Sequence, residues 1–121
     1  MVLTTVGPQS THGDGDNHVT QYIADTPLSC LEPAQYQNVD CLILCSSGIT
    51  CETVGLFELC TLQSLRKLYL DWNGLRDFDF IAQDMPQLCD LSGYGNQLLN
   101  IDGIRRLSGL KWLNVGANRD L

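Results

Sequence analysis

The residues of this 121-residue chain best suited to chemistry are its cysteines, because thiolates bind metals and act as nucleophiles. They stand at Cys30, Cys41, Cys45, Cys51, Cys60 and Cys89. No C-x-x-C pair of the kind found in zinc sites occurs. Cys41 and Cys45 would stand about 13 Å apart along an extended strand, too far to share one ion. We therefore expect no structural metal and interpret most cysteines as small packing residues.

A second candidate metal site is the H-x-D-x-D-x-H alternation over residues 12–18. A calcium loop starting at Asp14 would need glycine at its sixth position, where Val19 stands. It would also need a bidentate glutamate at its twelfth position, where Asp25 stands. The solvated-tail interpretation of this segment is therefore favoured over a cation site.

The sequence offers little to an enzyme. Both histidines lie in that polar tail, so neither is placed to activate a cysteine or serine, and no phosphate-binding glycine loop occurs. Three acids (Asp77, Asp79 and Asp84) lie on a segment that is better interpreted as solvated than catalytic. We predict a non-enzymatic protein with no catalytic residue and no cofactor. A metal or thiol enzyme is the remaining alternative.

The charge distribution excludes further functions. Seven basic and fourteen acidic residues give a net charge of −7, and the first basic residue is Arg66. So acidic a chain lacks the basic clusters that bind phosphate backbones, which predicts no direct nucleic-acid contact. The longest apolar stretch, about five residues, is too short for a membrane span. The segment before Arg66 has no basic secretory n-region, so we expect a reducing compartment rather than a disulfide framework.

The spacing of leucines indicates the elements that position these residues. The pattern L-x-x-L-x-L-x-x-N-x-L begins at Leu65 and recurs from Leu88, with Gly93 at the third leucine position. It recurs from Leu110 as far as Asn118, with Val115 at that position, and has a weaker copy from Val39. Its asparagine position, which Ser47 occupies in the first copy, falls at 47, 73, 96 and 118, at intervals of 26, 23 and 22 residues.

Each residue type in the pattern has a physical role. The x-L-x-L portion alternates as a short strand does, so Leu68 and Leu70 are expected to face a core. An asparagine where the strand turns away can satisfy buried backbone groups, which Ser47 does less well. After Asn96 the apolar residues fall at every third position, a period that favours 3-10 or short helical segments. The recurring asparagines and glycines disfavour the alternative, an amphipathic helical bundle.

The pattern resembles the leucine-rich repeat, whose consensus is the same string with a period of about 20–29 residues. It is most similar to the short cytoplasmic or nuclear subclass, which includes regulators of protein phosphatase 1, dynein light chain 1 of cilia and the A-prime protein of a spliceosomal particle. The resemblance covers residues 39–121. It implies an α/β solenoid of about four repeats, with a parallel sheet on the concave face and short helical or 3-10 turns on the convex side.

Strand alternation predicts the residues of the concave face. Cys41, Ile43, Cys45, Ser92 and Gly116 belong to it, and the predicted partner-binding residues are Lys67, Tyr69, Asp71, Trp72, Asp90, Tyr94, Trp112 and Asn114. Aromatic anchors among a few charges are typical of protein-binding hot spots. The alternative is that Tyr and Trp simply suit strands.

We expect three regions: a disordered polar tail over 1–20, an amino-terminal cap over 21–38 and a leucine-rich repeat domain over 39–121. Covering side chains of the cap would be Tyr22, Ile23, Leu28 and Leu31. At the other end four apolar residues (Leu107, Leu110, Leu113 and Val115) would border an open edge. We therefore expect either a truncated form or a partner or second copy that covers this edge.

The function predicted from these features is non-catalytic protein binding. The chain would be a scaffold or regulatory subunit that grips a protein partner on its concave face. The resemblance implies a cytoplasmic location, with cytoskeletal, ciliary or nuclear variants. The alternative function is a structural subunit of a large intracellular or ciliary assembly that docks through its ends.

Overall fold

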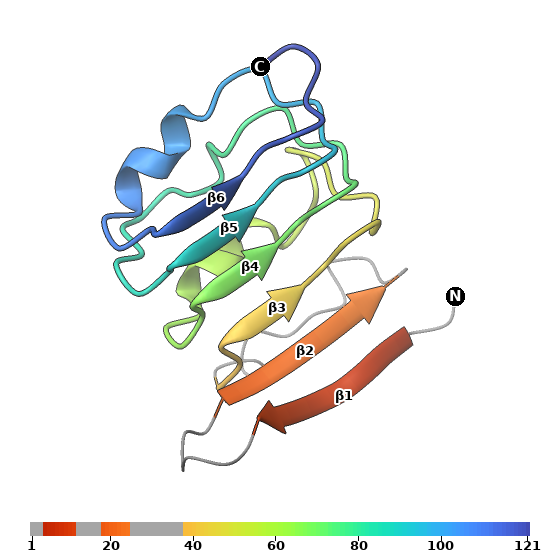
Figure 1. The fold of residues 1–121 in the computed structure, drawn as a ribbon, viewed down its shortest axis with the longest axis vertical. Helices are drawn as coiled ribbons and strands as arrows, with labels where there is room; N and C mark the ends of the chain where they lie inside the picture. The colour runs from red at the N-terminus through yellow and green to blue at the C-terminus, as the bar shows by residue number, and fades with distance from the viewer. Residues whose placement is uncertain (1–3, 12–17, 25–37) are drawn as a thin grey trace.

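A computed structural model describes residues 4–11, 18–24 and 38–121. Within these ranges the strands form one sheet in the order β1-β2-β3-β4-β5-β6, which is also their order along the chain (Figure 1). The strands are β1 (Thr4–Thr11), β2 (His18–Ala24), β3 (Cys41–Ile43), β4 (Lys67–Tyr69), β5 (Asp90–Ser92) and β6 (Trp112–Asn114). β1 pairs antiparallel with β2, and every later neighbour is parallel. The parallel sheet expected from the leucine spacing is therefore present.

The antiparallel pair β1–β2 lies where composition predicts a disordered tail and the start of a cap. Thr4 pairs with Ala24 and Thr11 with His18, with an irregularity between Val6 and Gln9. β1 is rich in threonine, and β2 contains valine, threonine, tyrosine and isoleucine, residue types that favour strands. Pairing satisfies the backbone groups of both segments. The expectation of disorder is thus replaced by strand over residues 4–11 and 18–20. The rest of the predicted cap beyond Ala24, to residue 37, lies outside the described residues.

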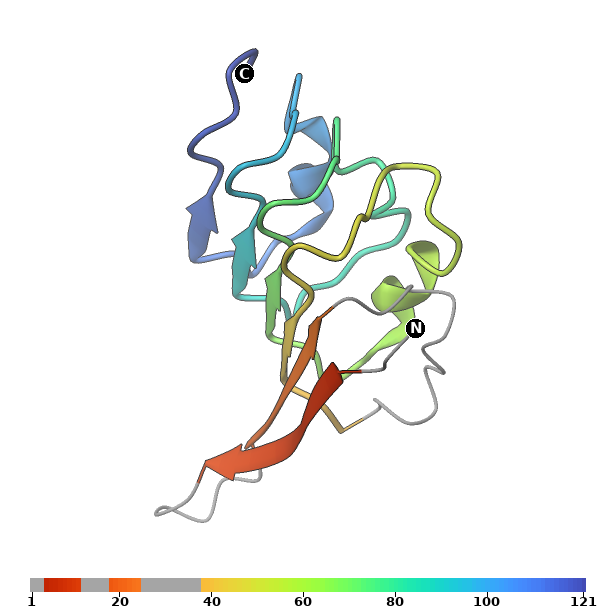
Figure 2. The same cartoon turned by 90° about the vertical axis from the view of Figure 1, so that its right-hand side faces the viewer.

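The connections between parallel strands cross the side of the core opposite the sheet. Two of them carry 3-10 helices, η3 (Phe57–Thr61) and η4 (Asp102–Arg106). Figure 2 shows the strands along one side of the molecule and these helices on the other. The helix η4 lies in the segment whose apolar residues recur at every third position, so the prediction of 3-10 structure there is confirmed. No helix in the described ranges is both long and apolar enough to cross a bilayer.

The core lies between the sheet and these connections. Leu42, Leu68 and Leu91 are in register on β3, β4 and β5 and are completely or almost completely buried. From the opposite side Phe78 and Phe80 pack edge to face, with ring centroids 6.3 Å apart. Full burial of each such apolar side chain contributes about 1.5–3 kcal/mol, so these leucines and phenylalanines stabilise the fold directly.

Asparagine side chains join successive strand ends. The Nδ2 group of Asn96 donates to the carbonyls of Leu70 and Gly93, both at 2.9 Å, and its Oδ1 accepts from the Leu75 N–H at 3.0 Å. Asn73 and Asn118 make equivalent bonds. At the first such position the Ser47 hydroxyl donates only to the nearby Cys45 carbonyl. The prediction that these amides satisfy turning backbone is confirmed.

Candidate protein-binding face

The solvent-facing side of β3–β6 carries the sequence-predicted site. The register aligns Cys41, Lys67, Asp90 and Trp112 in one row, and Ile43, Tyr69, Ser92 and Asn114 in a second. Residues two apart on a strand share a face, so both rows lie opposite the buried leucine row. We call the two rows, with Asp71, Trp72 and Tyr94 at the strand ends, the aromatic face.

Tyr69 and Trp112 contact each other across strand β5. Their ring centroids lie 6.0 Å apart with an interplanar angle of 71°, an edge-to-face pair. Because the residues come from β4 and β6, the rings must approach each other above β5. Ser92 on β5 is accordingly only 1% exposed although it belongs to the solvent-facing row. The small serine leaves room for this contact.

Trp72 and Tyr94 form a second edge-to-face pair, with ring centroids 5.3 Å apart and an interplanar angle of 79°. Trp72 follows β4 and is 58% exposed. Its φ of +58° lies in the left-handed region, which is unusual for a bulky residue. Trp72 directly precedes Asn73, and the residues that directly precede positions 47, 96 and 118 have the same conformation. Their φ values are +54° at Ser46, +71° at Gly95 and +53° at Ala117.

Two glycines form the floor beneath these rings. A Cβ atom added to Gly95 would lie 2.5 Å from the Trp72 ring, and one added to Gly116 would lie 3.0 Å from the Tyr94 ring. The tryptophan therefore packs directly on the backbone of the next turn. Strand alternation assigned Gly116 to the concave face, whereas the packing of Trp72 on Gly95 and of Tyr94 on Gly116 was not predicted. The signal that could have found them is their spacing from each preceding aromatic residue, 23 and 22 residues.

Charged groups on the aromatic face are few and predominantly acidic. Asp71 is half-buried and accepts a hydrogen bond from the Ser92 hydroxyl, which orients its carboxylate toward β5. Asp90, also half-buried, lies between Lys67 and Trp112 in the first row. Two carboxylates and one ammonium group give this set a formal charge of −1.

The structure thus places the sequence-predicted site residues on one surface. Direct contacts join Tyr69 to Trp112, Trp72 to Tyr94 and Asp71 to Ser92. Asn114 is less available, because its Oδ1 accepts from the Gly116 N–H at 3.1 Å and orders its own turn. The binding role of these residues remains a prediction.

Two cysteine thiols have pKa values that their surroundings raise, those of Cys60 and Cys45. Burial raises the pKa of the Cys60 thiol above its ordinary value of 9.0, partly offset by a backbone hydrogen bond from Ala82. Burial also raises the pKa of Cys45, and the negative charge of Asp71 adds to this effect, against a backbone hydrogen bond from Asp71 that lowers it. A raised pKa disfavours the reactive thiolate.

We expect the Cys60 thiol to contribute stability below pH 9 that is lost as the pH rises through the raised folded-state pKa. The reason is that the unfolded chain loses this proton at lower pH than the folded one. Urea unfolding between about pH 7 and pH 10.5 should show a smaller alkaline loss of unfolding free energy in Cys60→Ala than in the parent. Identical pH slopes in the two proteins would contradict the role of this thiol.

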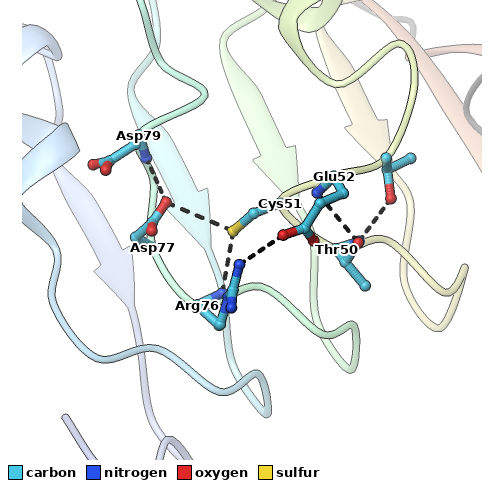
Figure 3. A network of polar contacts seen from close by, with 7 residues as sticks. Thr50, Cys51, Glu52, Arg76, Asp77 and Asp79 are labelled. Carbon is cyan, nitrogen blue, oxygen red and sulfur yellow. Dashed lines mark hydrogen bonds and ion pairs between the residues drawn. The ribbon is translucent and has the colours of Figure 1, made fainter.

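A polar network around Cys51 lies on the turns that follow β3 and β4 (Figure 3). The Cys51 Sγ accepts the Arg76 N–H at 3.4 Å and lies 3.6 Å from the Asp77 carboxylate, which also accepts the Asp79 N–H. Arg76 forms an exposed ion pair with Glu52 at 2.7 Å. These groups satisfy each other and the turn backbone, so the network has a structural role.

The remaining chemical candidates are dispersed. Cys45, Cys51, Cys60 and Cys89 are free thiols. No group of three or more His, Cys, Asp or Glu side chains in the described ranges could hold a metal ion. His12, Asp14 and Asp16 lie outside the described residues.

Comparison with protein-family models, with curated proteins and with solved structures finds no match to this chain.

Proposed function

We propose that this chain is a leucine-rich repeat solenoid that acts as a non-catalytic protein-binding module and grips a protein partner along its concave face. The aromatic face is that concave face. In this proposal the module serves as a scaffold or regulatory subunit inside the cell.

The repeat assignment draws support from the parallel strands and the asparagine ladder. Each of β3 to β6 is three residues long and centred on the inward-facing leucine of the sequence pattern. Asn73, Asn96 and Asn118 make the same set of backbone hydrogen bonds one turn apart. Equivalent residues in equivalent roles are what a stack of similar units produces.

The observation that carries the binding proposal is the exposure of organised aromatic rings. Trp72 is 58% exposed and Trp112 is 44% exposed, yet each is oriented by an edge-to-face partner. Tryptophan and tyrosine are the residues most enriched at hot spots, and pre-oriented rings lose little side-chain entropy on binding. Both pairs lie on one surface, so a single partner can contact them together.

Tyr69→Ala and Trp112→Ala are each expected to weaken partner binding by about 2 kcal/mol or more, because each removes one ring of a pair. The partner would first be captured by affinity purification and identified by mass spectrometry, and its affinity then measured by calorimetry. Leu99→Ala is the matched control, since Leu99 is 57% exposed outside the aromatic face. Equal affinity of all three variants for the partner would reject this face as the binding site.

A second candidate function, a structural subunit that docks through its ends, is favoured by the edge strand β6. Leu110, Leu113 and Val115 pack against the core but remain partly exposed beside this strand. An apolar edge of this kind suits a second protein surface. Light-scattering measurement of the solution mass tests it: a strictly monomeric chain would count against docking of a second copy here.

A further inference from the structure

We propose that the corner of the aromatic face formed by Asp71, Trp72 and Tyr94 binds the guanidinium group of an arginine in an extended segment of the protein partner. This inference rests on the proposed function and specifies the chemistry that the face recognises. The occupant is an arginine-bearing segment, and the subsite is a tryptophan ring with a neighbouring carboxylate.

The ring supplies the first half of the subsite. Trp72 packs on the backbone of Gly95 and against the edge of Tyr94, which orients it while 58% of the residue stays exposed. An indole is the best aromatic partner for a cation, and guanidinium groups stack on it readily.

The carboxylate supplies the second half. Asp71 directly precedes Trp72, and its Oδ1 accepts the Ser92 hydroxyl, so the group is fixed before any ligand arrives. A guanidinium group has five donors in a planar fork and bonds carboxylates more strongly than a neutral donor does. A lysine would lack the fork and the planar stacking surface, so arginine fits this pair better.

Charge complementarity favours a cationic occupant over other extended segments. Asp71 and Asp90 against Lys67 leave the face at −1, and the whole chain carries −7. Such a field attracts cationic segments during association and repels acidic or phosphorylated ones.

The turn that carries Trp72 does not itself require an aromatic side chain. Its left-handed conformation recurs at Ser46, Gly95 and Ala117, where the side chains are small or absent. The indole of Trp72 is therefore not required by the turn, and its exposed part is available to a ligand.

The test is a selection of peptides on the full chain. Random displayed peptides of about 12 residues, long enough at about 3.3 Å per residue to cross β3–β6, would be selected on the parent protein and on Trp72→Gly. Glycine fits the left-handed turn, so this variant should fold, which circular dichroism and a thermal melt would verify. We expect parent-specific peptides to share an arginine at a constant position.

Calorimetry then measures how much the arginine of the best parent-specific peptide and the Asp71 carboxylate contribute to the binding affinity. Replacing its arginine with citrulline, which keeps the shape but not the charge, should weaken binding about tenfold, and so should Asp71→Asn in the protein. Asp79→Asn is the matched control, an exposed aspartate outside the aromatic face, and should leave the affinity within about twofold.

The outcomes separate the two proposals. Parent-specific peptides without a shared arginine, or citrulline peptides that bind as well as arginine peptides, would overturn the guanidinium subsite and leave the binding face intact. If neither selection yields a peptide whose affinity depends on Trp72, Tyr69 or Trp112, both the subsite and the proposed binding face fail.

Discussion

Asn96→Ala is expected to lower the free energy of unfolding by about 2–3 kcal/mol. Asn96 is only 6% exposed, and its side chain is the acceptor for the N–H of the buried Leu75. The carbonyls of Leu70 and Gly93 would keep a second donor, from Asn73 and Asn118 respectively, so the Leu75 N–H carries most of the penalty. Urea unfolding monitored by circular dichroism measures the change.

The matched control for this variant is Asn118→Ala. Asn118 makes the same kinds of bonds but is half-buried, so water can replace part of what the amide supplies. We expect Asn118→Ala to lower the free energy of unfolding by about half as much as Asn96→Ala. Equal decreases in the free energy of unfolding at both positions would show that burial does not determine how much these amides stabilise the fold.

Phe78→Ala is expected to cost about 3–5 kcal/mol, the usual range for a fully buried phenylalanine. The ring is completely buried, contacts Phe80 edge to face and lies against Gly93, where an added Cβ would meet it at 2.9 Å. Its removal leaves a cavity between the sheet and the connections, since packed backbone on both sides cannot collapse inward. Thermal and urea unfolding would both report the loss.

Phe57→Ala provides the comparison. Phe57 opens the 3-10 helix η3 and is 57% exposed, so its truncation should change stability by less than about 0.5 kcal/mol. Similar decreases in the free energy of unfolding for Phe57→Ala and Phe78→Ala would contradict the assignment of Phe78 to the core.

The sheet could be predicted from sequence because period-two alternation assigns each residue a side. Lys67 and Tyr69 had to face away from the core once Leu68 and Leu70 faced it, and the asparagine spacing aligned the strands. The location of the candidate site on one face follows from the same short-range signal. Both depend on residues close in sequence, where local rules are strongest.

Other features depend on contacts that the pattern does not encode. The pairing of Tyr69 with Trp112 above β5 requires particular side-chain directions and a small residue at Ser92. Phe78 and Phe80 alternate with acids in a segment that appears solvated by composition, yet both are buried. The β1–β2 pair was missed because its polar, glycine-containing segments have the composition of a tail, while its stabilisation comes from pairing.

In this sheet the strands adjacent in space are also adjacent in sequence, from β1 through β6. A substitution on one strand therefore perturbs mainly the adjacent strands and the side chains that it contacts, because distant sites without shared contacts act independently. The outward-facing side chains of one strand can therefore change while the buried leucines stay the same. Natural or designed substitutions can alter this outward surface one strand at a time.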